Sequence, residues 1–326
     1  MDKQIMVSVV CNVYNHEKYL PQALDGFVAQ KTNFPFEVLV HDDASTDSSA
    51  EIIREYEKQY PHIIKPIYQS ENQYSKGIRI TPIYQFPRIQ GKYVAICEGD
   101  DCWTDPLKLQ KQFDFMEANP DYSLCACSTK WQNLKTGVVE NRGRTNNDID
   151  LTLEDLIMNR RDRFFQTASV FIKADVFMQM PAWRSKFPVG DLPLAILAGL
   201  NGKVHMLADQ MCIYHYYAEN SWTICKDNDD ARSRIAARMI EGYNALNEAT
   251  DYQYNDIITK RIKVSKYTHA LMTHDLKTLL SDELRDIYQS RSLVFRLSDV
   301  VRCKFPKIYN SLLKPLARKV KSQHVD

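Results

Sequence analysis

The sequence predicts an α/β fold in which a mostly parallel sheet carries helices on both faces. Short apolar runs rich in β-branched residues alternate with segments of helical spacing over the first 130 residues. These strand-like runs are apolar throughout instead of alternating with polar residues, which is typical of strands buried on both faces. The chain has 326 residues, about twice the usual length of one domain, so it can hold such a sheet and a further unit.

The expected elements follow the chain in a β–α–β–α order. Strands are expected at residues 5–11, 36–40, 63–69, 93–97 and 123–128. Helices are expected at residues 21–30, 48–60 and 107–119. After residue 130 the pattern loosens, and short strands are expected at 167–172 and 211–217. We therefore expect one domain at 1–228, with a regular half at 1–130 and a looser half at 131–228.

The last third of the chain is expected to be helical. Apolar residues recur there at spacings of three and four, which predicts helices at residues 232–247, 256–272 and 276–288. We place the boundary near Asn228, so that residues 229–326 form a helical extension. Its end is basic, because residues 291–326 contain nine Lys or Arg against two Asp, a local net charge of +7 in a chain whose total is +1.

Charge and composition exclude several classes of protein. The body of the chain is balanced in charge, so the broad basic surface of a nucleic-acid binder is not expected. No run reaches the ~18 apolar residues that a membrane span needs. The eight cysteines have no zinc or redox spacing, so disulfides are not expected. No secretory signal precedes the first expected strand, so the expected location is the cytoplasm.

Polar residues follow three of the expected strands, at the edge where a sheet of this kind binds its ligands. These residues are Asn12, Tyr14, Asn15, Asp42, Asp43, Glu98, Gly99, Asp100 and Asp101. Because the carboxyl ends of parallel strands meet at one edge, we expect a pocket rich in carboxylates. For Asp42 and Asp43 the alternative is a structural role, in which the segment only caps the helix that follows.

The segment from Glu98 to Asp101 holds three acids in four residues. Like charges at ~4 Å repel by several kcal/mol in a partly buried site, so a cation is expected among them. Oxygen ligands select Mg²⁺ or Mn²⁺, which commonly bridge one or two carboxylates to the phosphates of a substrate. Gly99 permits a tight turn between the acids. The alternative is an acidic turn that only faces solvent.

Several common catalytic motifs do not occur in the sequence. It contains neither of the glycine-rich phosphate-binding patterns G-x-x-x-x-G-K-[ST] and G-x-G-x-x-G. The nucleophile elbow G-x-S-x-G and the zinc motif H-E-x-x-H are also missing. Kinase-like, NAD-dependent, serine hydrolase and zinc protease activities are therefore not expected.

Three segments of the sequence resemble family 2 glycosyltransferases of the GT-A fold. They are residues 7–20 with Tyr14-Asn15-His16, residues 42–47 with Asp42-Asp43-Ala44-Ser45, and residues 91–103 with Glu98-Gly99-Asp100-Asp101. The similarity extends over residues 5–222. It implies inverting transfer of a sugar from a nucleotide-diphosphate sugar, with UDP as the default, to a hydroxyl of a glycan or lipid-linked acceptor in cell-surface polysaccharide synthesis. Residues 1–130 would then bind the donor, and 131–228 would shape the acceptor and catalytic half.

The resemblance also implies roles for the residues at the strand ends. The strand end at Asn12, Tyr14 and Asn15 would hold the nucleotide, and one of Asp42 and Asp43 would reach the base. Residues 98–100 correspond to the family's DXD element, in which Asp100 would bind Mn²⁺ or Mg²⁺. Glu98 is a second candidate metal ligand, and Glu98 or Asp101 would support the ribose or a metal-bound water.

Asp191 is the expected catalytic base. The segment Phe187-Pro188-Val189-Gly190-Asp191-Leu192 resembles the part of the family that holds this base. An acceptor hydroxyl is a poor nucleophile at pH 7, so a carboxylate within hydrogen-bond reach must take its proton as it attacks. The alternative is that Asp191 caps a helix beginning near Pro193.

The remaining candidates are His215, Thr167, Ser169 and Trp222. The family often has Tyr-Arg-x-His where this chain reads Tyr214-His215-Tyr216-Tyr217, so His215 would contact the diphosphate or the metal; the alternative is a half-buried strand histidine. Thr167, Ser169 and Trp222 would line the acceptor pocket, while small residues at 167–169 also permit close packing.

The basic tail mixes its cations with apolar residues, which are Phe305, Ile308, Tyr309, Leu312, Leu313 and Leu316. This mixture is typical of a segment that lies on an anionic membrane surface, so we expect peripheral contact with the cytoplasmic face of a membrane. The alternative is a solvated terminal helix.

Two other classes of protein stay open. A nucleotidyltransferase would share the α/β sheet and the acidic metal site, but the basic glycine-rich loop expected for a triphosphate does not occur at residues 10–20. A non-catalytic sugar-nucleotide binder or membrane-associated scaffold would keep Asp42 and Asp43 and would not need Asp191.

Overall fold

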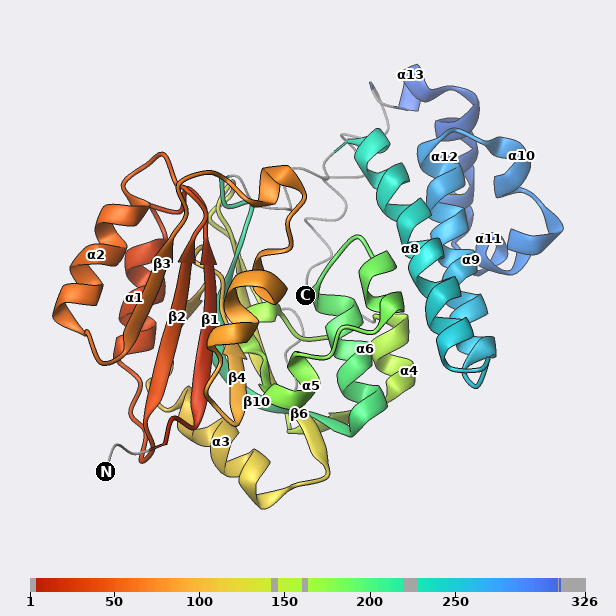
Figure 1. Cartoon of the computed structure of the whole chain (residues 1–326). Helices are drawn as coiled ribbons and strands as arrows, with labels where there is room; N and C mark the ends of the chain where they lie inside the picture. Colours follow the sequence, from red (N-terminus) through yellow and green to blue (C-terminus); the bar gives the residue numbers. More distant parts are fainter. Residues whose placement is uncertain (1–3, 142–145, 160–163, 220–227, 310, 312–326) are drawn as a thin grey trace. The chain divides into compact units, whose positions relative to one another are not determined.

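The computed structural model describes residues 4–141, 146–159, 164–219, 228–309 and 311. The chain divides into two compact units (Figure 1). The first unit takes in Met1–Met180 and Gly190–Ile224, and the second takes in Pro181–Val189 and Cys225–Asp326. Trp222 and most of the basic tail lie outside the described residues, so the predictions for them stay predictions.

The first unit is built on one sheet of ten strands, counted over the part of the chain that the structure describes. The strands are β1 (Val7–Val13), β2 (Phe36–Asp42), β3 (Ile64–Tyr68), β4 (Tyr93–Ile96), β5 (Cys102–Trp103), β6 (Tyr122–Asn133), β7 (Val139–Glu140), β8 (Ile149–Leu151), β9 (Phe171–Lys173) and β10 (Lys203–Tyr216). Their order is β3-β2-β1-β4-β9-β6-β10-β5, with β7 paired to β6 and β8 paired to β10.

The long strands of this sheet all point the same way. β1 pairs in parallel with β2 and β4, and β2 with β3. The short strand β9 is antiparallel to both β4 and β6, so β6 has the direction of β4, and β10 is parallel to β6. The predicted α/β fold with a mostly parallel sheet is therefore confirmed, and the carboxyl ends of β1, β2, β4 and β10 share one edge.

Helices cover both faces of the sheet (Figure 1). The helices and turns of the first unit are α1 (Leu20–Val28), α2 (Ser49–Gln59), η1 (Tyr74–Lys76), η2 (Thr81–Gln85), η3 (Phe86–Arg88), α3 (Lys108–Ala118), α4 (Leu153–Met158), η4 (Thr167–Ser169), α5 (Ala174–Phe177) and α6 (Asp191–Asn201). In α1 the apolar residues recur at spacings of three and four, and Leu20, Ala23, Leu24 and Phe27 are buried as a result. They share one core with Val9 of β1.

The structure corrects the strand expected at 167–172. Residues 167–169 form the 3₁₀ turn η4, and the strand β9 begins only at Phe171. The cause is local, because both the backbone N–H and the hydroxyl of Ser169 donate to the carbonyl of Gln166, at 3.0 and 2.7 Å. Such side-chain bonds to nearby backbone compete with strand pairing.

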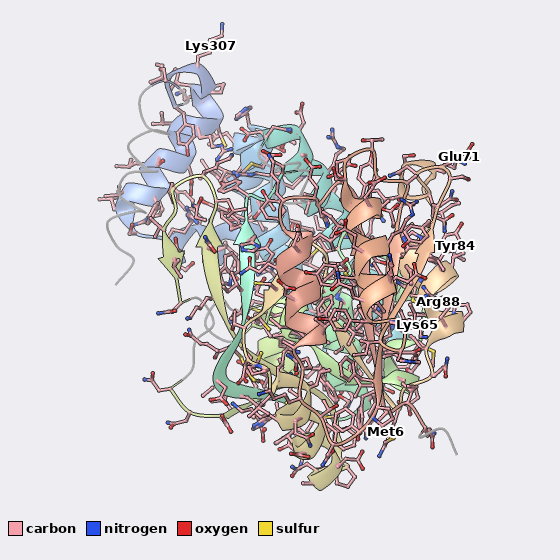
Figure 2. The ribbon with its side chains drawn as sticks, turned by 90° about the vertical axis from the view of Figure 1, so that its left-hand side faces the viewer. Met6, Lys65, Glu71, Tyr84, Arg88 and Lys307 are labelled. Atoms are coloured by element: carbon pink, nitrogen blue, oxygen red, sulfur yellow. The ribbon has the colours of Figure 1, made fainter. Side chains whose placement is uncertain are left out.

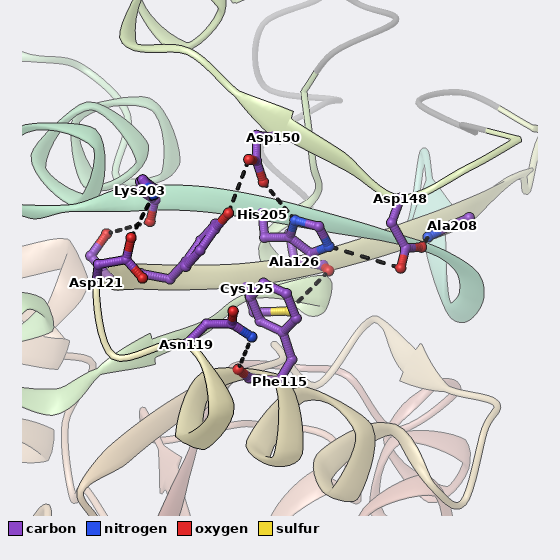
Figure 3. A network of polar contacts seen from close by, with 12 residues as sticks. Phe115, Asn119, Asp121, Cys125, Ala126, Asp148, Asp150, Lys203, His205 and Ala208 are labelled. Atoms are coloured by element: carbon purple, nitrogen blue, oxygen red, sulfur yellow. Dashed lines mark hydrogen bonds and ion pairs between the residues drawn. The ribbon is translucent and has the colours of Figure 1, made fainter.

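The strand expected at 211–217 is much longer in the structure. β10 begins at Lys203 and pairs with β6 over its length, with irregularities between Leu207 and Cys212. A polar network fastens the short strand β8 to it (Figure 3). His205 Nδ1 lies 2.7 Å from the Asp150 carboxylate, which also accepts from the Tyr122 hydroxyl at 2.9 Å. The His205 ring stacks on Phe115, with ring centroids 4.1 Å apart.

The second unit is helical. Its elements are η5 (Ala182–Lys186), α8 (Asp229–Ala249), α9 (Asn255–Met272), α10 (Leu276–Leu279), η6 (Asp282–Leu284), α11 (Arg285–Ser290), α12 (Leu293–Lys304) and α13 (Pro306–Ile308). The helices predicted near 232–247 and 256–272 correspond to α8 and α9. Tyr243 of α8 packs edge-on against Phe187, with ring centroids 5.1 Å apart. Among the described residues, no helix is long and apolar enough to cross a membrane.

The single helix expected at 276–288 is wrong. The structure has three short elements there instead: α10, η6 and α11. Leu279 and Leu284 are both fully buried in one small core with Ala270. Residues five apart do not share a helix face, so a break at Ser281, whose backbone is extended, is what allows both leucines to enter this core.

We predict that Gly91→Ala destabilises the chain. A Cβ atom at Gly91 would lie 2.5 Å from the backbone nitrogen of Ser8 and 2.7 Å from the carbonyl oxygen of Tyr93. Backbone atoms of a buried sheet cannot yield cheaply, so we expect a loss of about 1–3 kcal/mol or more in the free energy of unfolding. Urea unfolding measures this change. Gly190→Ala is the control, because no atom lies within 4 Å of its added Cβ; equal midpoints for the two variants would contradict the packing account.

Candidate active site at the carboxyl edge of the sheet

Two strand ends hold residues 98–101, which we call the acidic turn. On one side the backbone N–H of Gly99 donates to the carbonyl of Asn12 at the end of β1, at 3.1 Å. On the other side the backbone N–H of His215 in β10 donates to Asp101 Oδ1 at 3.0 Å. The structure therefore brings together three segments that are far apart in the sequence, which are the end of β1, the acidic turn and the end of β10.

Glu98 is fixed by Asn12. Its Oε2 accepts from the Asn12 backbone N–H at 3.2 Å, and its Oε1 accepts from Asn12 Nδ2 at 3.4 Å. Burial, and then the charge of Asp100, raise the pKa of Glu98 to about 7, although the bonds from Asn12 oppose this shift. Glu98 thus ties the turn to β1 with both of its oxygens.

Gly99 is required by close packing. A Cβ at this position would lie 2.9 Å from His16 Nδ1 and 2.9 Å from Val13 Cγ2. Both distances are shorter than real Cβ contacts, so a side chain would push the turn away from β1. This close approach of the turn to β1 is the physical reason why glycine stands at position 99.

His215 is oriented by the acidic turn. The ring is buried, with 4% of the residue exposed, and its Nδ1 lies 2.6 Å from the carbonyl oxygen of Asp100. A carbonyl oxygen only accepts, so Nδ1 must hold the proton, and in the neutral ring Nε2 is the nitrogen with the lone pair. This arrangement is the usual way in which a protein orients a metal-binding histidine.

The acidic turn has no Lys or Arg partner among the described side chains. Burial, followed by the charge of Asp100, raises the pKa of Asp101 well above its ordinary range. Within the described ranges, no Lys or Arg forms an ion pair with Glu98, Asp100 or Asp101. Three carboxylates without a cationic partner form a site at which a divalent cation would be strongly stabilised.

The side chains alone do not form a complete metal cage. No group of three or more His, Cys, Asp or Glu side chains with the geometry to hold a metal occurs among the described residues. Asp100 and His215 are the candidate donors here, and an ion bound by them would have to take its other ligands from phosphate and water, as Mg²⁺ usually does. Mn²⁺ accepts the same oxygen donors together with an imidazole.

The carboxylates of Asp42 and Asp43 differ in the hydrogen bonds that they accept. Both oxygens of Asp43 are engaged, accepting from the backbone N–H groups of Gln73 at 2.8 Å and Tyr74 at 3.0 Å. Asp42 accepts a long 3.4 Å bond from the Ser45 N–H, and its buried Oδ1 has no hydrogen-bond partner among the described residues. Burial raises the pKa of Asp42. Asp43 therefore fixes the segment after β3, and Asp42 keeps an oxygen for a ligand.

The loops after β1 and β2 are bonded to each other. The backbone N–H of Asn15 donates to Ser45 Oγ at 3.0 Å, and Asn15 Oδ1 accepts from the Thr46 N–H at 2.7 Å. Asn15 has a positive φ of 55°, which asparagine tolerates. Asn15 thus fixes the rim of the site, whereas Tyr14 is 39% exposed at its edge.

Asp191 lies at the first position of α6. Only Gly202 separates α6 from the start of β10, and α6 packs against β6 and β10, so the helix runs opposite to these strands. Its N-terminus therefore points toward the carboxyl edge of the sheet, as Figure 1 shows. Asp191 is exposed, and its Oδ1 accepts from the Leu192 N–H at 2.8 Å.

The two described acceptor candidates differ in exposure. Thr167 is partly exposed, so an acceptor could reach it. Ser169 is fully buried, and its hydroxyl donates to the carbonyl of Gln166. Trp222 lies outside the described residues.

Sequence reasoning missed Gln85. This residue ends η2, is fully buried, and donates from Nε2 to the carbonyl of Leu39 at 3.0 Å and to Asn12 Oδ1 at 3.3 Å. Thr81, at the start of η2, accepts from Asn12 Nδ2 at 3.2 Å. Asn12 is thus held by η2 as well as by Glu98. The Thr81-Pro82 pair, a common helix start, is the signal in the sequence that indicates η2.

Comparisons with known proteins agree on one family. The model described as "Glycosyl transferase family 2" matches residues 8–181. An uncharacterized protein of Mycobacterium tuberculosis is 33% identical over 227 residues, which cover 66% of this chain and 60% of that relative. The match thus spans 60% of that relative's length. A Bacillus subtilis protein, named putative teichuronic acid biosynthesis glycosyltransferase TuaG, is 33% identical over 111 residues, or 34% of this chain and 42% of its own.

Two solved structures share the fold. The S. aureus TarS structure 1-349 in complex with UDP has a TM-score of 0.57 at 18% identity, covering 99% of this chain and 88% of TarS. The mannosyltransferase PcManGT from Pyrobaculum calidifontis, in complex with GDP-Man and Mn²⁺, has a TM-score of 0.56 at 15% identity, covering 95% of this chain and 83% of its own. The helical C-terminal region lies within both coverages.

We predict that Glu98 makes the metal-free chain less stable as the pH rises from about 5 to about 7. The folded-state pKa of Glu98 is about 7, against an ordinary value of 4.5, so in this window Glu98 has released its proton in the unfolded chain and still holds it in the folded chain. The contribution of Glu98 to the free energy of unfolding therefore falls through the window and levels off above it, whereas burial lowers the pKa of His41 and gives a contribution of opposite sign. Urea midpoints at several pH values, with EDTA present, measure the slope.

The variant Glu98→Gln should have a shallower slope, because Gln keeps the shape and has no proton to release. Glu241→Gln, at an exposed position of α8, is the control and should keep the wild-type slope. The same slope in Glu98→Gln and wild type would show that Glu98 does not titrate in this window.

Proposed function

Because the chain belongs to glycosyl transferase family 2, we propose that it transfers a sugar from a nucleotide-diphosphate sugar to a hydroxyl group of a glycan or lipid-linked acceptor. The observation that supports this most is the acidic turn, whose carboxylates have no cationic partner among the described side chains and whose backbone orients His215. Such a site suits the diphosphate of a donor together with its cation. The name of the relative TuaG supports a role in polysaccharide synthesis.

The donor end of the reaction would depend on Asp100 and His215. We assign both as ligands of Mn²⁺ or Mg²⁺, with Glu98 as a residue that positions Asp100 because its own oxygens are bonded to Asn12. When bound, such an ion neutralises the charge that develops on the departing diphosphate. Asp101 is buried and bonded to the His215 backbone, so it fixes the turn from the other side.

We assign uridine diphosphate as the nucleotide. The TarS structures with UDP and with UDP-GlcNAc support this assignment at the level of the fold, whereas the PcManGT structure contains GDP-Man. Asp42 is the better of the two aspartates for a contact with the base, because its Oδ1 has no partner and Asp43 is saturated. Asn12 and Tyr14 would complete the nucleotide site.

Asp191 would act as the base. Because α6 begins at the carboxyl edge of the sheet, we expect the Asp191 carboxylate near the acidic turn, where it would take the proton of the acceptor hydroxyl as that oxygen attacks the anomeric carbon. Attack from the face opposite the departing diphosphate inverts the configuration. The bond from the Leu192 N–H favours the second candidate, a sugar-nucleotide binder in which Asp191 only stabilises the first turn of α6.

We predict that Asp100→Asn lowers the Mn²⁺-dependent affinity for UDP at least about tenfold, because it removes the charged metal ligand. Calorimetry with UDP, with and without Mn²⁺, measures the difference. Asp114→Asn, on the exposed side of α3, is the matched control and should bind as wild type. Unchanged Mn²⁺-dependent binding in Asp100→Asn would reject the metal assignment.

We predict that Asp191→Asn lowers turnover about 10²–10⁴-fold, the usual contribution of a general base, and leaves UDP affinity unchanged. Release of UDP from the donor, with water as the acceptor, measures turnover. The control is Asp175→Asn, because Asp175 occupies the first turn of α5 and its Oδ1 accepts from the next N–H at 2.8 Å, as in Asp191. Equal turnover in the two variants would mean that Asp191 only stabilises the first turn of α6 and is not the base.

A further inference from the structure

The second unit exposes a group of large apolar side chains at its C-terminal end. We call this group the apolar edge, and it consists of Leu293, Val294, Leu297, Phe305 and Ile308. Leu293, Val294 and Leu297 are 63%, 74% and 58% exposed. Residues at spacings of three and four share a helix face, so Leu293, Leu297 and the following Val301 lie in one row along α12.

The orientation of α12 is fixed by its opposite face. Asp299 is buried and accepts from the Tyr267 hydroxyl at 2.7 Å and from Arg291 Nε at 2.7 Å. Arg302 is buried and pairs with Asp229 at 2.7 Å, and Cys303 enters the core of Leu279 and Leu284. If α12 rotated about its axis to bury the apolar edge, these contacts would be lost. The packing of the opposite face therefore keeps the apolar edge exposed.

Cations surround the apolar edge. Lys304 and Lys307 are exposed beside Phe305 and Ile308, and Figure 2 shows the Lys307 side chain directed away from the ribbon. The residues from 312 onward, outside the described part, add four more cations in the sequence: Lys314, Arg318, Lys319 and Lys321. The only acids after residue 290 are Asp299, which is engaged inside, and Asp326.

This charge decides between three possible occupants of the apolar edge. In a symmetric dimer the edge would face itself, which would bring Lys304 and Lys307 of both copies into one interface, and the only acid among the described residues after 290, Asp299, is already engaged. If the tail folded back over the edge, its four cations would come to lie beside Lys304 and Lys307. An anionic bilayer instead offers an apolar layer for the leucines and phosphate groups for the lysines.

We propose that α12 and α13 form an interfacial segment that docks on an anionic lipid bilayer, with the apolar edge inserted at the boundary between headgroups and acyl chains. Lys304 and Lys307 then contact lipid phosphates. Sequence reasoning placed a membrane contact in the tail alone, and the structure extends it to Leu293, Val294 and Leu297. The proposal does not depend on the enzymatic activity, because every residue in it belongs to the second unit.

Flotation of the full chain with lipid vesicles tests the proposal. We expect wild type to float with vesicles of phosphatidylcholine and phosphatidylglycerol at a 7:3 ratio, and to bind phosphatidylcholine alone about tenfold or more weakly. Binding to the anionic vesicles should weaken as NaCl is raised, because salt screens the lysines. The double variant Leu293→Ser/Leu297→Ser should bind anionic vesicles roughly tenfold less than wild type, because it removes apolar contact and no charge.

The control is Val138→Ser/Val139→Ser, which changes two exposed apolar residues of the first unit and should float as wild type. Circular dichroism of each variant checks that the helices are kept. Equal flotation of Leu293→Ser/Leu297→Ser and wild type, or no flotation of wild type, would overturn the proposal. A concentration-dependent dimer in sedimentation that this variant abolishes, without vesicle binding, would assign the edge to a second copy.

Discussion

The site depends on the repulsion among three carboxylates that the fold holds within four residues. Glu98, Asp100 and Asp101 cannot separate, because Glu98 is bonded to Asn12 of β1 and Asp101 is bonded to the backbone of β10. Burial and mutual repulsion raise the pKa of Glu98 and of Asp101. A divalent cation would offset this repulsion, which is the physical reason for the cation that we propose at the acidic turn.

The direction of the strands explains why His215 contacts the acidic turn and why α6 begins at the same edge of the sheet. β9 reverses the chain between β4 and β6, so β10 ends at the same edge as β1, and α6 begins at that edge. His215 and Asp191 thus reach the edge from segments that follow the acidic turn by about a hundred residues. The backbone carbonyl of Asp100 also fixes the tautomer of His215. The acidic turn therefore supplies the carboxylates and also determines which nitrogen of His215 keeps its lone pair.

The part of the fold that could be predicted from the sequence is the part determined locally. The strands before residue 130 are continuous apolar runs, and the acids after them are adjacent in the chain, so their shared edge followed from strand direction alone. Three features could not be predicted, because each depends on a contact made elsewhere in the fold. The turn at Ser169 depends on its bond to Gln166, and the role of Gln85 depends on its buried bond to Leu39. The break at Ser281 depends on a core that contains both Leu279 and Leu284. Asp42 and Asp43 look alike in the sequence, and only the folded segment at Gln73 and Tyr74 distinguishes them.

A crystal structure of the full chain with Mn²⁺ and UDP, measured with anomalous scattering from manganese, tests the central claim most directly. The account predicts one manganese peak at bonding distance from an oxygen of Asp100 and beside the diphosphate, with the Asp191 carboxylate facing the bound donor. UDP bound with manganese elsewhere, or Asp191 facing a separate cavity, would contradict it.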